Sequence, residues 1–149
     1  MQKRNLVTFA IISYRLQHRL RLGKVCSPFG VEVFSTQRQF LNFLRENDVQ
    51  MVILAGLPFS EYESLIKNIR MENKNVQEIL VFEEFVTISI SQLVSWEIKS
   101  YLGSPKKHQE IELWIENATK GNYTITQNTH PSILRKYLFY LYNHIRRRL

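Results

Sequence analysis

The chain has few of the residues on which several kinds of site depend. It has one cysteine, Cys26, and therefore neither a disulfide framework nor a cysteine-based zinc site. Its five glycines form no Gly-rich phosphate loop, which excludes a Rossmann-type nucleotide site. No Gly-x-Ser-x-Gly elbow occurs. The histidines have no metal-ligand spacing and are predicted to lie on the surface: His18, His108, His130 and His144. We therefore expect no enzyme activity, no cofactor and no metal site.

Long hydrophobic runs are also missing. No apolar stretch approaches the roughly 20 residues of a membrane span. The basic N-terminus is followed by an apolar part that is too short for a signal peptide, so residues 6–12 are predicted to be a buried first strand. Cys26 is predicted to pack in the core, and a lone thiol fits a reducing compartment. These features predict a cytoplasmic protein that does not contact a membrane.

Acidic residues are absent from both ends of the chain, whose net charge is +7. Residues 1–31 and residues 117–149 each carry six Lys or Arg, and all 13 acids lie between them. Basic ends attract nucleic acid or acidic partners, although ordinary charge scatter on a solvated surface is the alternative interpretation. The candidate nucleic-acid contacts are the cations near the C-terminus: Arg135, Lys136, Arg146, Arg147 and Arg148.

What the chain does have is an alternation of strand and helix patterns. The unbroken apolar run over residues 51–55 is typical of a strand buried on both faces of a parallel sheet. Further strands are predicted for residues 31–34, 77–82 and 98–102, and helices for residues 14–25, 36–46, 61–71, 87–96 and 106–120. This order predicts an α/β fold with a five-stranded parallel sheet, doubly wound so that helices cover both faces.

Two apolar stripes indicate which helix faces are buried in the core or contact a partner. In the first helix, Leu16 and Leu20 are predicted to face the core, with the arginines outward. After the main domain, residues 1–127, a sixth helix is predicted near the C-terminus, in residues 128–149. Its stripe, together with two aromatics, is the candidate dimer or partner face: Leu134, Leu138, Leu141, Ile145, Trp96 and Tyr101. The alternative is that the aromatics fill the core.

Three segments resemble one known family. Residues 49–70 are similar to the third strand, loop and helix of a response-regulator receiver domain, which is CheY-like. Residues 100–105, SYLGSP, resemble the receiver's Gly-Tyr-Leu-x-Lys-Pro. Residues 110–126 resemble the end of a receiver in a NarL/LuxR-type transcriptional regulator. The resemblance implies a flavodoxin/CheY-like domain of a two-component system, with residues 128–149 as a linker helix.

The chemistry of that family is not matched by this sequence. Receivers hold Mg²⁺ with two acids after the first strand and accept a phosphoryl group on an aspartate after the third. Here the first acid is Glu32, the acceptor position is Ala55, and the only aspartate is Asp48, at the other end of its strand. Hard cations such as Mg²⁺ need oxygen ligands. The resemblance is therefore to a pseudo-receiver that cannot be phosphorylated.

Two other receiver positions differ as well. The Thr or Ser after the fourth strand falls near Phe82 and Glu83, and Glu83 and Glu84 are predicted to be solvated. The lysine of the fifth strand is replaced by Ser104, although Pro105 matches. We expect an atypical regulator acting in transcription through protein contacts, with another regulator subunit or as a homodimer. A small basic DNA-binding protein that uses its C-terminal helix is the alternative, as is a truncated remnant, because too few residues follow Leu102 for a helix-turn-helix domain.

Overall fold

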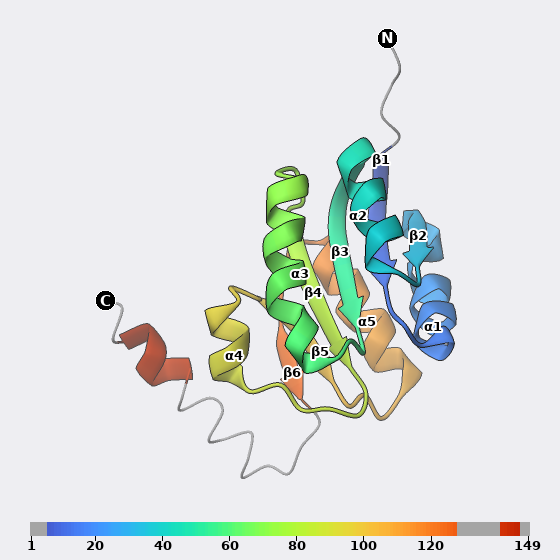
Figure 1. Ribbon diagram of the computed structural model, residues 1–149. Helices are drawn as coiled ribbons and strands as arrows, with labels where there is room; N and C mark the ends of the chain where they lie inside the picture. Colours follow the sequence, from blue (N-terminus) through green and yellow to red (C-terminus); the bar gives the residue numbers. More distant parts are fainter. Residues whose placement is uncertain (1–5, 128–140, 147–149) are drawn as a thin grey trace.

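Strands and helices alternate along the chain, as the sequence predicts. The computed structural model describes residues 6–127 and 141–146 (Figure 1). Its strands are β1 (Leu6–Ile12), β2 (Val31–Phe34), β3 (Asp48–Ala55), β4 (Glu78–Glu83), β5 (Ser100–Gly103) and β6 (Ile125–Gln127). Its helices are α1 (Leu16–Cys26), the 3₁₀ turn η1 (Ser27–Phe29), α2 (Gln37–Glu46), α3 (Phe59–Glu72), α4 (Ile90–Ser95) and α5 (His108–Thr119). Residues 141–146 are helical too. No helix among the described residues is long and apolar enough to cross a membrane.

All strand pairs of the sheet are parallel, in the order β2-β1-β3-β4-β5-β6. Residues alternate between two cores along each central strand. Ala10, Val52 and Val81 face α2, α3 and α4, whereas Phe9, Ile53 and Leu80 face α1 and α5. Figure 1 shows α2 and α3 in front of the strands and α5 behind them. The sheet is therefore covered on both faces, which explains its unbroken apolar runs.

The sheet has six strands, not the five that the sequence predicts. The sixth, β6, pairs parallel with β5, and Tyr101 N donates to Thr124 O at 2.9 Å. The Tyr101 hydroxyl also donates to Gln127 Oε1 at 2.8 Å. A three-residue strand is too short to give a periodic signal, so only these contacts with β5 define it.

Helix α1 presents a different face to the core from the one predicted. His18, Leu22 and Cys26 are buried, while Leu16 and Leu20 are exposed. The expectation that Leu16 and Leu20 point inward is thus wrong, as is the expectation of a surface His18. The Leu16–Leu20 stripe and the His18–Leu22–Cys26 stripe both have four-residue spacing. Leu22 and Cys26 pack in the same core as Phe9 of β1, so the second stripe is the buried one. Cys26 is fully buried in the core, as predicted, and this burial raises the pKa of its thiol to about 12.

The two aromatics predicted for a partner face lie inside the molecule. Trp96 stacks on Tyr62, with ring centroids 5.4 Å apart, and Tyr101 is buried in the same core. The expectation that they supply an exposed contact is therefore corrected, because their rings fill the space between the sheet and α3. Of the C-terminal set, Leu141, Ile145 and Arg146 are described. The remainder lies outside the described residues: Leu134, Arg135, Lys136, Leu138, Arg147 and Arg148.

We predict that Gly103→Ala weakens the attachment of β6. A Cβ at this position would lie 2.7 Å from Cδ of Gln127, closer than side chains approach one another. Overpacking of this kind costs about 1–3 kcal/mol. Urea unfolding followed by tryptophan fluorescence should show the loss, and hydrogen exchange at the Tyr101 amide should accelerate. Gly23→Ala in α1, where a Cβ meets only Val33 Cγ2 at 3.3 Å, is the control. A Tyr101 amide equally protected in both variants would contradict the prediction.

Candidate functional site

The loops at the carboxyl edge of the sheet form the candidate site. In open parallel sheets this edge is where ligands bind. The register places Ala55 beside Phe82, and Glu83 beside Gly103. Ser104 follows β5 directly. The structure therefore brings together the positions that the receiver resemblance singles out.

The space above the end of β3 is filled by a ring from α1. Ala55 is buried, and Gly56 turns the chain with φ +60°, its N–H donating to Phe82 O at 3.0 Å. A Cβ on Gly56 would lie 2.6 Å from both Cε1 and Nδ1 of His18. Only glycine fits here, because the imidazole lies directly against the turn.

His18 is held from several sides and is 2% exposed. Its Nε2 lies 3.0 Å from Glu84 Oε2, and its Nδ1 lies 3.5 Å from Ser13 Oγ. The ring packs edge-to-face on Phe82 at 5.4 Å, and Arg21 lies 3.7 Å from the other oxygen of Glu84. These contacts tie α1 to the loop after β4. Sequence reasoning missed His18 because Glu84 is distant in the chain, although the His18–Leu22–Cys26 spacing was visible.

Glu83 is a buried acid with a phenol partner. The Tyr62 hydroxyl donates to Glu83 Oε1 and accepts from Leu57 N at 3.2 Å. Burial raises the pKa of Glu83 to about 7, although the Tyr62 hydrogen bond and the charge of Arg15 lower it. Burial and the adjacent carboxyl also raise the pKa of Tyr62. The expectation of a solvated acid pair is therefore wrong, since burial encloses Glu83 and His18 engages Glu84.

Ser104 braces the same loop through its backbone and its hydroxyl. Its N–H donates to Glu83 O at 2.7 Å, and its Oγ donates to Glu84 O at 3.3 Å. The residue adopts φ +50°, and the half-buried Pro105 follows it. Ser104 thus contributes hydrogen bonds to the main chain at a position where receivers carry a cationic side chain.

A hollow of about 330 Å³ opens beside this cluster. Its lining combines Arg15 with exposed apolar side chains from three loops and the first residue of α3. The Arg15 guanidinium lies 5.0 Å from the Phe85 ring centroid. The apolar members are Tyr14, Pro58, Phe59, Phe85 and Val86. Among residues 6–127 and 141–146, no three His, Cys, Asp or Glu side chains are grouped so that they could hold a metal ion.

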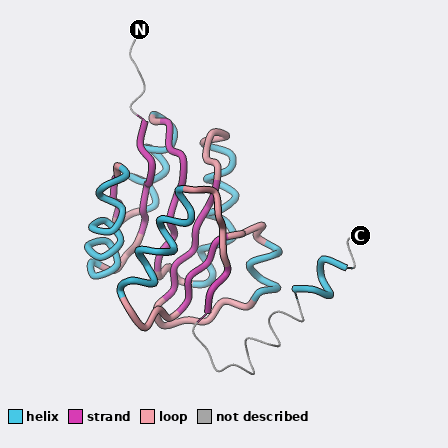
Figure 2. Tube along the Cα trace, turned by 180° about the vertical axis from the view of Figure 1, so that it is seen from behind, coloured by secondary structure: helices cyan, strands magenta, loops and turns pink. Residues whose placement is uncertain are grey.

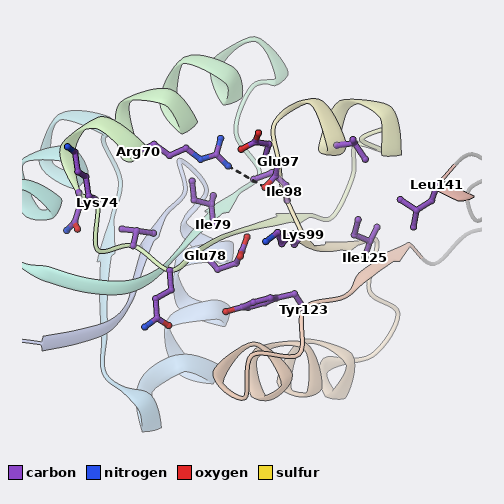
Figure 3. A pocket seen from close by; sticks show the side chains of 14 residues that line it. Arg70, Lys74, Glu78, Ile79, Glu97, Ile98, Lys99, Tyr123, Ile125 and Leu141 are labelled. Atoms are coloured by element: carbon purple, nitrogen blue, oxygen red, sulfur yellow. Dashed lines mark hydrogen bonds between the residues drawn. The ribbon is translucent and has the colours of Figure 1, made fainter. Parts of the chain in front are cut away.

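A larger hollow, about 960 Å³, lies at the opposite edge of the sheet. Figure 3 shows Glu78, Lys99 and Tyr123 around it, with Leu141 of the C-terminal helical stretch at one side. Burial raises the pKa of Glu78, while Lys99 and Arg70 oppose the shift. Of the residues that the sequence singled out, Leu141 alone lines this hollow.

We predict that Glu83 makes the protein less stable as pH rises. Its folded pKa, about 7, exceeds the ordinary 4.5, so the proton favours the folded state and this stabilisation is lost between those values. The full effect is roughly 3 kcal/mol. Glu83→Gln should be more stable than the wild type at pH 8 but not at pH 4, as measured by urea unfolding. The exposed Glu63→Gln is the control; equal pH profiles for Glu83→Gln and the wild type would refute the assignment.

The comparisons with known proteins come from solved structures. A response regulator from Thermotoga maritima is similar over 78% of this chain and 99% of its own, with TM-score 0.63 and 16% identity. The signal receiver domain of an HD domain-containing protein from Pseudomonas fluorescens Pf-5 is similar over 80% of this chain and 98% of its own, with TM-score 0.63 and 21% identity. The isolated REC domain of RcsB from Salmonella enterica serovar Typhimurium is similar over 88% of this chain and 98% of its own, with TM-score 0.64 and 16% identity.

No protein-family model matches the chain, and no curated protein matches it. The structural similarity covers 78–88% of this chain, but identities at this level show the fold alone. Together with the strand order β2-β1-β3-β4-β5, these similarities establish that the chain has the α/β fold of a CheY-like response-regulator receiver domain, with β6 added at one edge.

Proposed function

We propose that this chain is a cytoplasmic, NarL/LuxR-type receiver module that acts in transcription regulation without being phosphorylated and without enzyme activity of its own. It works through contacts with other proteins. The observation that carries the proposal is the buried His18 ring, which lies against Gly56, the residue that follows Ala55 at the end of β3. Further support comes from the nearby carboxyl groups of Glu83 and Glu84, whose oxygens already have partners.

Phosphoryl transfer to a receiver needs an acceptor carboxylate and a cation bound by oxygen ligands. The methyl side chain of Ala55 has no oxygen that could accept a phosphoryl group. The two nearby carboxylates are already engaged, Glu83 by the Tyr62 hydroxyl and Glu84 by His18 and Arg21. A cation would have to displace these partners, and a phosphoryl group would have to displace the imidazole as well. The arrangement therefore opposes both.

The contacts around the loop after β4 also replace what a phosphoryl group would do there. Its main chain is bonded to Ser104 from one side, and its Glu84 side chain to His18 from the other. These bonds hold the loop in one arrangement without a covalent signal. We therefore expect a constitutive conformation, which partners recognise directly.

Exposed apolar side chains at the same edge support a role in protein contacts. Phe59, Phe85 and Val86 are each about half exposed or more, and they surround one hollow. Clustered apolar side chains on a surface mark interaction sites more often than isolated ones do. The partner in this proposal is another regulator subunit or a second copy of the chain.

We predict that the full chain takes no phosphoryl group. The purified protein would be incubated with acetyl phosphate and Mg²⁺, and its intact mass followed over time. A receiver domain with its acceptor aspartate, treated in parallel, shows that the reagents work. Beryllofluoride with Mg²⁺ should likewise leave the amide resonances of Gly56 and Glu84 unchanged. A phosphoryl adduct that peptide mapping places at the carboxyl edge would overturn the proposal.

The DNA-binding alternative makes the opposite prediction about salt. Six phosphate contacts would lose about three orders of magnitude in affinity between about 50 and about 200 mM salt. Under our proposal, fluorescence anisotropy with labelled duplex DNA detects no such binding at either salt. Replacing Arg146, Arg147 and Arg148 by Gln is the matched variant. Binding that is strong at low salt, collapses at high salt and weakens in this variant would favour the alternative. A chain that unfolds without cooperativity would favour the remnant.

A further inference from the structure

We propose that the hollow at the carboxyl edge of the sheet is a binding site for a small aromatic carboxylate. The carboxylate of this ligand pairs with Arg15, and its ring contacts the apolar side chains that surround the hollow. The inference goes beyond the proposed function, which needs no ligand. It is argued from the size of the hollow, from its aromatic walls, from a cation without an ion pair and from a buried carboxyl group.

The hollow lies where the loops after β1, β3 and β4 meet. These loops run along the lower edge of the sheet in Figure 1, and along the same edge when the molecule is seen from behind in Figure 2. Sites for small molecules are mostly apolar cavities of about 300–1,000 Å³ with a few polar groups. At about 330 Å³, this hollow is at the small end of that range and suits a molecule of about one or two rings.

Aromatic side chains make up much of the wall. Tyr14, Phe59 and Phe85 are 39%, 53% and 66% exposed, and Pro58 and Val86 complete the apolar part. Aromatic rings gain from contact with another ring beyond the area that is buried. An inorganic anion would leave these side chains in water, so the walls favour a ligand with a ring. A bound ring would also cover part of the surface that the proposed function offers to a partner.

Arg15 supplies the positive charge, and its guanidinium lies over the Phe85 ring. The next arginines are engaged, since Arg19 donates to a main-chain oxygen at 2.8 Å and Arg21 pairs with Glu84. Among the described residues, no acid forms an ion pair with Arg15. A guanidinium that lies over a ring keeps its N–H groups directed outward in its plane, where a carboxylate can accept a pair of hydrogen bonds.

The second polar group of the hollow belongs to Glu83, which is 3% exposed. Its Oε1 accepts from the Tyr62 hydroxyl, whereas no residue in the described part of the chain is hydrogen-bonded to its Oε2. Because burial raises the pKa of Glu83 to about 7, the group is about half protonated at neutral pH and repels an anion less than a full carboxylate does. In its protonated form it can donate a hydrogen bond to an oxygen of the ligand.

Other classes of ligand fit the hollow less well. A cation would be repelled by Arg15, which faces no acid in an ion pair. A neutral hydrocarbon would cover Arg15 and Glu83 without pairing either of them, and burial of unpaired polar groups costs free energy. A ring that carries a carboxylate satisfies the walls and the cation together.

The test follows the amide resonances of the full chain by NMR while β-naphthoate is added. We expect saturable shifts at Arg15, Gly56 and Phe85, with a dissociation constant of about 1 mM or tighter. Two further probes separate the contributions, because β-naphthamide has the ring without the charge and acetate has the charge without the ring. Each should bind at least about tenfold more weakly than β-naphthoate.

Variants assign the two parts of the site. Arg15→Gln should weaken β-naphthoate binding at least about tenfold and change β-naphthamide binding by less than about twofold, since only the charge pairing is lost. The matched control is Lys120→Gln, which removes an exposed cation at the other end of the molecule, after α5. Phe85→Ala should weaken both probes, whereas Met71→Ala, at another exposed side chain, should weaken neither. Thermal unfolding by circular dichroism checks that each variant is folded.

The inference would be overturned if no probe produced saturable shifts at the carboxyl edge, if β-naphthoate and β-naphthamide bound equally, or if Arg15→Gln left β-naphthoate binding unchanged. None of these results bears on phosphorylation. A chain that binds no probe and takes no phosphoryl group would contradict this site and leave the proposed function standing. A phosphoryl adduct at the carboxyl edge would contradict the proposed function whatever the probes do.

Discussion

A buried imidazole has to keep hydrogen-bond partners for its ring nitrogens, and that requirement organises one whole side of this molecule. His18 meets it with Glu84 on one nitrogen and Ser13 on the other. Since His18 points inward, its helix can turn neither Leu16 nor Leu20 toward the sheet. The side chain that lies against the Gly56 turn therefore also decides which residues of α1 are exposed.

The neighbouring acid follows a related constraint. Glu83 lies in a core that raises its pKa, and a phenol holds it in place of a strong cation. Buried pairs of this kind add little stability compared with apolar residues of similar size, because desolvation offsets their attraction. What they do provide is geometry. Through Tyr62, His18 and Ser104, the loop after β4 is connected to three separate elements, and this is why we regard it as fixed in one arrangement.

The sequence predicts most of the fold and part of the site, for identifiable reasons. Long apolar runs such as residues 51–55 are enough by themselves to predict a buried strand. The receiver resemblance places Ala55 and Ser104 at one edge of the sheet, where the structure has them. It does not reveal β6, whose three residues carry no period. Nor does it choose between the Leu16 and His18 stripes of α1, because both have the spacing of a helix. The deciding partner of His18 is 66 residues away in the chain. Burial of polar groups depends on such distant partners, which local patterns do not contain.

The exposed leucines of α1 are the counterpart of the filled site. Full burial of a leucine is worth about 1.5–3 kcal/mol, so a helix that points two of them at water leaves that stabilisation unrealised within one chain. The sheet cannot recover it, since rotating α1 would expose His18, Leu22 and Cys26 and break the contact with Glu84. The filled site and the exposed leucines of α1 therefore have a single cause, the orientation of His18.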